Sequence, residues 1–234
     1  MDEIFKLYGI TLMLLSSIEY ISFDCYGTLT NFQIGKLTKK LFADRIPENL
    51  MSEFLIDYSA FRFDEVLGAW KPYYDVLHDA LARTCNKWTI DFTKEDAEVI
   101  YEMVPTWGAH FEVPGALEKI ATVLPLVILS NAADEQIQNN VNKLGVSFHS
   151  VLTAEQAGAY KPRLQAFEYM FDSLNSKPEH FLHVSSSLRY DLMSAHDLKI
   201  STRVFVDRGH GPGCPAFEYY EIKDLWGLPA LLGV

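Results

Sequence analysis

Polar side chains that could carry chemistry follow four separate stretches with the apolar, β-branched composition of buried strands. In chain order these groups are Asp24, the pair Ser130-Asn131, Lys161, and the segment 185–191. The carboxyl ends of parallel strands meet at one edge of an open α/β sheet, which is where such sheets place their ligand sites. We therefore expect these groups to converge in space although they lie far apart along the chain.

The residue types at these positions suggest nucleophilic chemistry on an anionic substrate. The carboxylate of Asp24 can attack an electrophilic carbon or phosphorus and form an ester, which water then cleaves. Thr28, Ser130 and Asn131 supply neutral donors for a substrate carboxylate or phosphate. Lys161 supplies a positive charge, which we expect to lower the pKa of Asp24 and to neutralise an anionic substrate.

The residues just after Asp24 predict a tight turn. Gly27 follows three positions later and permits backbone conformations that other residues avoid. Backbone N–H groups of such a turn can hold a developing anion. Cys25 is interpreted as a small core residue and not as a second nucleophile.

The composition describes an ordinary folded protein and excludes some partners. The chain has 234 residues, of which 49% are hydrophobic and 22% charged, enough for a sizeable core. Its net charge of −11 argues against nucleic-acid binding, which requires a cationic surface. The three cysteines show no C-x-x-C spacing, so we expect reduced thiols and a cytoplasmic location.

An apolar run at residues 7–18 needs an interpretation. Asp2 and Glu3 precede it, whereas a secretory signal begins with basic residues. The run is also too short to span a bilayer, and no other segment is a candidate, so we expect no membrane association. We interpret the run as a leader into the first strand, with Met13 as an alternative start.

The hydrophobic pattern predicts an α/β fold in two parts. Between residues 31 and 104 the sequence has only helical patterns, with predicted helices at 35–43, 47–63, 68–85 and 93–101. Beyond Pro114, strand and helix patterns alternate, which predicts a doubly wound parallel sheet with right-handed crossovers. The predicted strands are 124–129, 147–152, 181–184 and 200–206; the predicted helices are 116–123, 134–144, 163–174 and 188–198, with a closing element at 225–232. The predicted domains are therefore an α/β core, 1–30 and 105–234, and an inserted helical cap, 31–104.

The segment from Asp24 to Leu29 spells D-x-Y-G-T-L, which resembles the first motif of the haloacid dehalogenase (HAD) superfamily. The spelling is that of its 2-haloacid dehalogenase branch. The four groups named above match all four motifs of the superfamily in order and spacing, from about residue 18 to 207. The resemblance implies a Rossmann-like core, an inserted cap and an aspartate nucleophile.

Two departures from the phosphatase branch of this superfamily bear on the cofactor. Tyr26 stands where phosphatases have a second Asp, and Ser186 stands where they have the first Asp of an acidic pair. Only Asp24 and Asp191 remain, whereas Mg²⁺ prefers carboxylate oxygens. We therefore predict no metal and no cofactor, with an Mg²⁺-dependent phosphatase as the alternative.

The resemblance implies a metal-independent, (S)-2-haloacid dehalogenase-like hydrolase acting on a small 2-substituted carboxylic acid. The resemblance implies that Asp24 is the nucleophile on C2 and that Lys161 balances its charge. It implies that the substrate carboxylate is bound by Thr28, Ser130 and Asn131, and that the hydrolytic water is handled by Ser185, Ser187 and Asp191. The walls of the pocket would include Tyr26 and Trp107. Related dehalogenases are commonly dimers, so the family also implies a homodimer.

Three positions depart from the dehalogenase branch itself. Its halide-binding Arg aligns with Ile56, and Arg62 is the nearest alternative; its fourth-motif Asn is Ser187, and its Tyr after the Lys is Phe167. Two further readings therefore stay open. One is a relative that cleaves another bond from carbon to a heteroatom beside a carboxylate. The other is a non-catalytic protein of this fold, which a retained Asp24 and Lys161 pair argues against.

Overall fold

The computed structural model describes residues 17–234. The alternative start at Met13, and the predicted leader as far as residue 16, lie outside this range. Within the described part of the chain, no helix is both long enough and apolar enough to cross a membrane.

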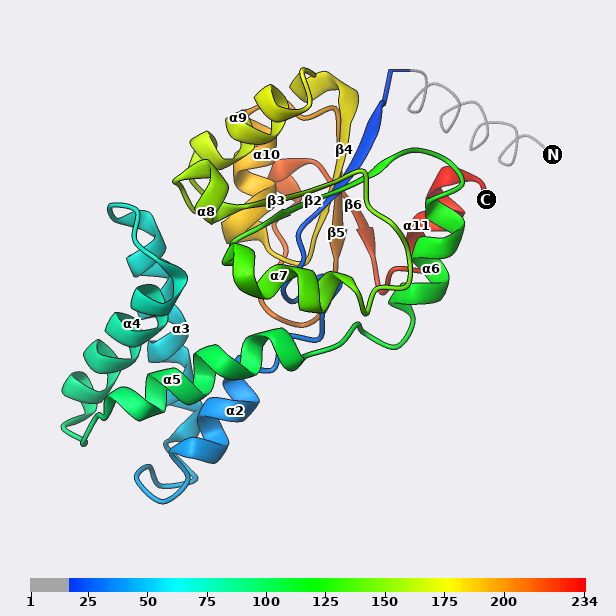
Figure 1. Cartoon of the computed structure of the whole chain (residues 1–234). Helices are drawn as coiled ribbons and strands as arrows, with labels where there is room; N and C mark the ends of the chain where they lie inside the picture. Colours follow the sequence, from blue (N-terminus) through cyan, green and yellow to red (C-terminus); the bar gives the residue numbers. More distant parts are fainter. Residues whose placement is uncertain (1–16) are drawn as a thin grey trace.

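A single parallel sheet of six strands forms the centre of the molecule, in the order β3-β2-β1-β4-β5-β6 (Figure 1). The strands are β1 (Tyr20–Phe23), β2 (Leu126–Ser130), β3 (Ser150–Thr153), β4 (Phe181–Ser185), β5 (Thr202–Val206) and β6 (Tyr220–Ile222). Phe23 of β1 pairs with Ile128 of β2 on one side and with Val184 of β4 on the other. The strand order thus reverses on either side of β1, which makes the end of β1 the point where ligand sites form in such sheets. The predicted fold class is confirmed.

Helices cover both faces of the sheet. One apolar core packs the sheet against α6 (Val113–Ile120), α7 (Asp134–Val141) and α11 (Gly227–Leu232). A second core packs the opposite face against α9 (Leu164–Ser173) and α10 (Met193–Asp197), and the short α8 (Ala154–Ala157) precedes α9. All residues of β2 and β4 are buried, as expected for central strands of a parallel sheet covered on both faces.

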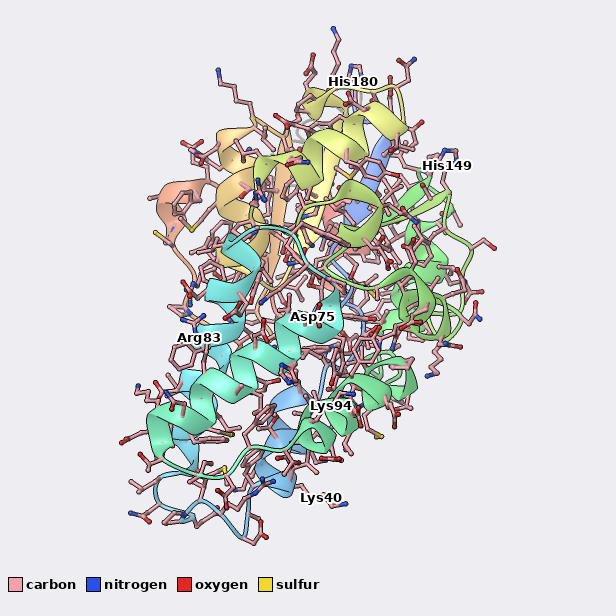
Figure 2. The ribbon with its side chains drawn as sticks, turned by 60° about the vertical axis from the view of Figure 1, so that its left-hand side comes forward. Lys40, Asp75, Arg83, Lys94, His149 and His180 are labelled. Carbon is pink, nitrogen blue, oxygen red and sulfur yellow. The ribbon has the colours of Figure 1, made fainter. Side chains whose placement is uncertain are left out.

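The segment between β1 and α6 folds into helices alone, as its pattern predicts. These are α2 (Ile34–Leu41), α3 (Met51–Leu67), α4 (Tyr73–Trp88) and α5 (Lys94–Met103), called here the four-helix group. They share an apolar core of their own and lie beside the sheet, beyond the end of β1 (Figures 1 and 2). Thr93 caps α5 in a reciprocal capping box with Asp96, and Arg45 holds both oxygens of that Asp96 carboxylate.

Some elements of the structure differ from the prediction. The helix predicted at 68–85 begins only at Tyr73, because Gly68 ends α3 and Pro72 precedes the new helix. The helix predicted at 188–198 is a π-helical turn, η3 (Leu188–Leu192), followed by α10. The edge strand β6 is missing from the prediction, because it is three residues long and largely exposed and so lacks an apolar run.

Candidate active site

Asp24 directly follows β1 and is only 7% exposed. The ammonium of Lys161 lies 2.9 Å from Asp24 Oδ1 and 2.6 Å from Asp191 Oδ1. Lys161 is itself 1% exposed, and its Nζ also donates to the carbonyl of Leu129 at 2.7 Å. Groups from the ends of three strands therefore meet at one point, and a single buried cation lies between two carboxylates.

The side chain of Asn131 fixes the backbone of Lys161. Asn131 Nδ2 donates to the Lys161 carbonyl at 2.8 Å, and the Lys161 N–H donates to Asn131 Oδ1 at 2.7 Å. This two-way amide pairing ties the end of β2 to the loop that carries Lys161. Asn131 thus positions the ammonium, and it also lines the pocket described below.

Thr28 contacts the Asp24 carboxylate directly. Its hydroxyl donates to Asp24 Oδ2 at 2.6 Å and accepts from the Ser186 N–H at 2.8 Å. Because Thr28 is fully buried and its proton is engaged by Asp24, it orients that carboxylate and has no proton free for a substrate. The expectation that Thr28 binds the substrate carboxylate is therefore corrected.

The turn after Asp24 has the predicted form. Gly27 has a φ of +94° and its N–H donates to the Thr30 carbonyl. Cys25 points into the core, and burial raises the pKa of its thiol to about 12, so it stays protonated. Its interpretation as a core residue is confirmed.

Asp191 lies in η3 with no exposure to solvent. Its Oδ1 contacts Lys161 and also lies 3.1 Å from His183 Nε2. Its Oδ2 has no hydrogen-bond partner among residues 17–234. A buried carboxylate oxygen without a partner is costly unless a ligand or a water completes it.

The pKa values of the Asp24 and Asp191 carboxylates are shifted in opposite directions. Burial raises the pKa of Asp24 and, with the nearby Asp191 charge, outweighs the lowering by Lys161. Burial would also raise the pKa of Asp191, but Lys161 and His183 together bring it below the ordinary value. Lys161 does lower the pKa of Asp24, as expected, but burial and the charge of Asp191 outweigh it, so the expected net depression is wrong. Burial opposes the charge of Lys161 too, but both carboxylates raise its pKa and it stays protonated.

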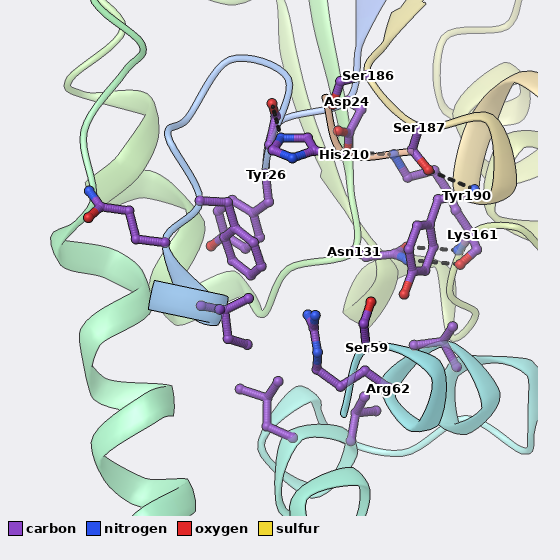
Figure 3. A pocket seen from close by; sticks show the side chains of 18 of the residues that line it. Asp24, Tyr26, Ser59, Arg62, Asn131, Lys161, Ser186, Ser187, Tyr190 and His210 are labelled. Atoms are coloured by element: carbon purple, nitrogen blue, oxygen red, sulfur yellow. Dashed lines mark hydrogen bonds and ion pairs between the residues drawn. The ribbon is translucent and has the colours of Figure 1, made fainter. Parts of the chain in front are cut away.

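A pocket of about 570 Å³ opens between this sheet edge and the four-helix group. Its polar lining includes Asp24, Lys161 and Asp191 on the sheet side, and Ser59 and Arg62 on α3. Figure 3 shows Ser59 and Arg62 extending from α3 toward the residues at the end of the sheet. Its apolar lining comes from the four-helix group and the chain leading into it, with Phe32, Ile34, Val66, Tyr73, Val76 and Leu77.

Arg62 is a cation that faces this pocket without an acidic neighbour. No hydrogen bond or ion pair joins its guanidinium to another residue of the described chain, its Nε is buried, and it stacks on the Tyr58 ring at 5.0 Å. Ile56, the position that aligns with the halide-binding Arg of the resembling family, is 65% exposed and does not line the pocket. Of the two positions weighed in the sequence, only that of Arg62 reaches the pocket.

The other predicted site residues divide between the pocket and its support. Tyr26 lines the pocket, stacks on Phe32 and donates to Asn140 Oδ1 at 3.1 Å. Ser187 also lines it, and its hydroxyl accepts from the Tyr190 N–H at the start of η3. Ser185 lies behind Ser187, whose N–H it accepts at 3.0 Å.

Two predicted residues do not reach the pocket. Ser130 is buried, and its hydroxyl has no hydrogen-bond partner within residues 17–234. Trp107 is buried too and does not line the pocket, although its ring packs edge-on against Phe32, which does. Ser130 is the last residue of β2, and Trp107 belongs to the core of the four-helix group.

Sequence reasoning missed several residues of the site. Ser59, Tyr190 and His210 line the pocket, and His183 lies beneath it in contact with Asp191. His183 carried a readable signal, because it is a polar residue inside the otherwise apolar run of β4. His210 lies in the Gly-rich stretch after β5 and contacts the Gly27 carbonyl at 3.3 Å, a proximity that only the folded chain reveals.

The donor set gives a poor fit to a hard divalent cation. Among the described residues, no cluster of three or more His, Cys, Asp or Glu is arranged to hold a metal ion. The two carboxylates at the strand ends both contact the ammonium of Lys161, and Ser186 adds only a neutral hydroxyl. Mg²⁺ would have to compete with Lys161 for the same oxygens.

The core is a doubly wound α/β sheet with two carboxylates and a lysine at the carboxyl end of its central strand. Residues 18–198 match the family model described as haloacid dehalogenase-like hydrolase. The chain belongs to that family, and the resemblance read from its motifs is confirmed.

Individual relatives give a finer comparison. Haloacetate dehalogenase H-2 of Moraxella sp. (strain B) is 28% identical over 179 residues, covering 74% of this chain and 79% of the relative. (S)-2-haloacid dehalogenase 2 of Pseudomonas sp. (strain CBS-3) is 27% identical, covering 74% and 77%. The structure of L-2-haloacid dehalogenase from Xanthobacter autotrophicus with chloropropionic acid covalently bound superposes with a TM-score of 0.74 at 18% identity, over 92% of this chain and 98% of that one. That structural likeness shows a shared fold.

Proposed function

We propose that this protein is a metal-independent hydrolase that uses Asp24 to displace the substituent from C2 of a small carboxylic acid, with (S)-2-haloacids as its substrate class. The observation that carries the proposal is the shared contact of Lys161 with Asp24 and Asp191, opposite an unpaired Arg62 across one pocket. The names of the relatives, a haloacetate and an (S)-2-haloacid dehalogenase, agree with it.

In the first step a carboxylate oxygen of Asp24 forms a bond to C2, while the bond from C2 to the halogen breaks. The halide leaves with the bonding electron pair, and Asp24 becomes an ester. A halide leaving group takes no proton, so this step needs no general acid, and Tyr26 in place of a second Asp is no obstacle. Thr28 orients the attacking carboxylate through its hydrogen bond to Oδ2.

In the second step water attacks the carbonyl carbon of the Asp24 ester. Asp191 accepts a proton from that water as the new bond forms, and the ester bond then breaks. The departing 2-hydroxy acid takes one of the two protons of the water, and the other is released to solvent by way of Asp191, so that Asp24 is regenerated as a carboxylate. Lys161, in contact with both side chains, stabilises the negative charge that develops on the carbonyl oxygen.

Arg62 and the Ser59 hydroxyl are the groups we assign to the anionic parts of the substrate, its carboxylate or the departing halide. A guanidinium without an acidic partner in a partly apolar pocket attracts anions strongly, because little water screens it. Asn131 and the backbone N–H groups after Asp24 lie on the opposite side of the pocket. On this proposal the four-helix group, 31–104, is a cap over the core formed by 1–30 and 105–234.

The pocket also has room for more than a three-carbon acid. An engineered cavity of roughly 150 Å³ holds one benzene ring, whereas this pocket measures about 570 Å³. Its lining from the four-helix group is largely apolar. We therefore extend the proposed substrate class to acids with a hydrocarbon chain on C2.

A phosphatase using Mg²⁺ on Asp24 and Asp191 is the second candidate, and a protein cleaving another carbon–heteroatom bond beside a carboxylate is the third. In the phosphatase, Mg²⁺ would have to displace Lys161 from both carboxylates. A cytoplasmic location and a homodimer stay predictions of the sequence and of the family resemblance.

One assay separates these candidates. The enzyme is incubated with (S)-2-chloropropionate and, separately, with p-nitrophenyl phosphate, each with EDTA or with Mg²⁺. We expect chloride release that EDTA does not reduce, and no phosphate release. Phosphate release that requires Mg²⁺ would support the phosphatase, and turnover of neither would direct the search to other C2 substituents.

A further inference from the structure

His183 is a fully buried histidine in the middle of the apolar strand β4, two residues before the strand ends. Its Nε2 lies 3.1 Å from Asp191 Oδ1, and its Nδ1 lies 2.9 Å from the hydroxyl of Ser22. The ring packs edge-on against Phe167 at 5.3 Å between centroids. Both ring nitrogens are thus engaged, and the hydrocarbon side of the ring is enclosed.

The hydrogen bonds around His183 determine which nitrogen carries the proton. An ionised carboxylate only accepts hydrogen bonds, so Nε2 must be protonated to contact Asp191. In the neutral ring Nδ1 then accepts, and Ser22 supplies the proton of that second hydrogen bond. Ser22 lies on β1, immediately before Phe23 and Asp24. The chain Ser22, His183, Asp191 therefore links the strand that carries the nucleophile to the turn that carries the second carboxylate.

Both polar contacts of Asp191 fall on the same oxygen. Lys161 and His183 approach Oδ1, while Oδ2 has no partner among the described residues. The charged and titratable groups that face Asp191 are Lys161 from the loop before α9, His183 from β4, Asp24 across Lys161, and the adjacent Tyr190 of η3. With Oδ1 fixed by two donors, the carboxylate cannot rotate without losing both, and Oδ2 is left as the oxygen available to water.

We propose that His183 is a positioning residue for the hydrolytic step: it donates to Asp191 Oδ1, keeps that carboxylate ionised beside Asp24, and presents Oδ2 to the water. This inference rests on the proposed function, because it needs an Asp24 ester to be hydrolysed. The proton balance is that of the second step, in which water gives one proton to Asp191 and its oxygen to the ester carbonyl. His183 keeps its Nε2 proton throughout.

The test is His183→Phe, which keeps a ring in the enclosure and removes both nitrogens. Halide formation in the first turnover should stay close to wild type, because Asp24, Thr28 and Lys161 are unchanged. Hydrolysis of the ester should slow by about tenfold to a hundredfold, the effect of losing a hydrogen bond to a charged group. The Asp24 ester should then accumulate, visible by mass spectrometry of the intact protein after rapid acid quench.

A pH profile separates positioning from mere packing. Without the His183 donor the pKa of Asp191 rises, so the acidic limb of the hydrolysis rate should move to higher pH in His183→Phe. His183→Gln places an amide N–H near the former Nε2. It should restore both the rate of ester hydrolysis and the wild-type position of its acidic limb. His149→Phe, an exposed histidine at the edge of the molecule away from the four-helix group (Figure 2), is the matched control and should change neither.

If His183→Phe fails to fold, Ser22→Ala takes its place, because it leaves His183 present and removes only the partner of Nδ1. We expect ester hydrolysis to slow and its acidic limb to move to higher pH, both by less than in His183→Phe. Normal hydrolysis and an unmoved acidic limb in a folded variant would overturn the inference and leave the proposed function standing. Wild-type enzyme that forms neither halide nor ester would overturn both.

Discussion

Lys161 lies closer to Asp191 than to Asp24, at 2.6 Å against 2.9 Å, so the residue assigned to the water holds the cation at least as firmly as the nucleophile does. A single positive charge therefore serves two carboxylates. The pKa of Asp24 lies above its ordinary value because burial, with the charge of Asp191, outweighs Lys161; the pKa of Asp191 lies below its ordinary value because Lys161 and His183 together outweigh burial. The arrangement keeps a base for the second step ionised, although it weakens the ionisation of the nucleophile.

Removal of the shared cation should be costly for the fold. Lys161→Met leaves Asp24 and Asp191 buried without their counter-charge, which destabilises by about 3–5 kcal/mol in comparable buried pairs. We expect a loss of that order in the free energy of unfolding by urea at neutral pH, together with loss of turnover. The loss in the free energy of unfolding should be smaller in mild acid, where the carboxyls take up protons.

The double variant Asp24→Asn, Lys161→Met is the control for that experiment. It removes one negative charge with the positive one, so it should be more stable than Lys161→Met alone. A double variant that is less stable by the sum of the two single effects would show that the pair does not interact, contrary to the geometry.

The pH dependence of the first step follows from the raised pKa of Asp24. As the pH falls through that pKa, Asp24 gains a proton and stops acting as a nucleophile. The single-turnover rate of halide formation should therefore fall on the acidic side at a pH above 3.8, the ordinary value of an Asp carboxyl. Lys161, whose pKa is raised, stays charged and should cause no loss at mildly alkaline pH. An acidic limb below 3.8 would contradict the balance of burial over Lys161.

Arg62 should matter for turnover far more than an arginine that does not line the pocket. Arg62→Leu removes the cation that faces the pocket, and we expect kcat/KM to fall by at least about tenfold, the value of one charge-assisted hydrogen bond. Arg189→Leu is the matched control: this Arg stacks on Phe63 at 3.8 Å and does not line the pocket. Ile56→Arg should rescue nothing, because that position faces solvent. Equal losses for Arg62→Leu and Arg189→Leu would refute the assignment.

Substrate length should reveal the apolar part of the pocket. Each buried methylene contributes about 0.8 kcal/mol, or about fourfold in kcat/KM. A series from 2-bromopropionate to 2-bromohexanoate should therefore improve stepwise. Val66→Trp, which fills the space beside Leu77, should reverse the trend and leave the shortest acid least affected. A wild-type preference for the shortest acid would show that the extra volume is not used.

The sequence predicted the parts of the site that follow from strand ends. Asp24, Lys161 and Asp191 meet as expected, because the pattern of apolar runs specifies a parallel sheet and such a sheet brings its carboxyl ends together. The helical nature of 31–104 was readable for the same reason, since helical and strand periodicities differ. The helix starting at Tyr73 was predicted too early, because an apolar pattern does not show where Gly68 ends the preceding helix.

The sequence could not predict which group each polar side chain of the site contacts in the folded protein. Thr28 has the residue type of a substrate ligand, but its proton is engaged by Asp24. Ser130 is a polar residue at a strand end, yet it is buried and does not line the pocket. His183 contacts Asp191 from a neighbouring element, and no spacing pattern in the sequence predicts that contact. Each of these depends on side-chain direction, which a one-dimensional pattern does not contain.

The most direct test of the central claim is the fate of oxygen in a single turnover. The enzyme, in excess over (S)-2-chloropropionate, reacts in water labelled with oxygen-18, and the peptide carrying Asp24 is then analysed by mass spectrometry. Attack by Asp24 followed by hydrolysis at its carbonyl predicts label in the Asp24 carboxyl and none in the 2-hydroxy acid, with no reaction in Asp24→Asn. Label in the product and none in Asp24 would mean that water attacks the substrate directly, and the account of Asp24 as a nucleophile would be wrong.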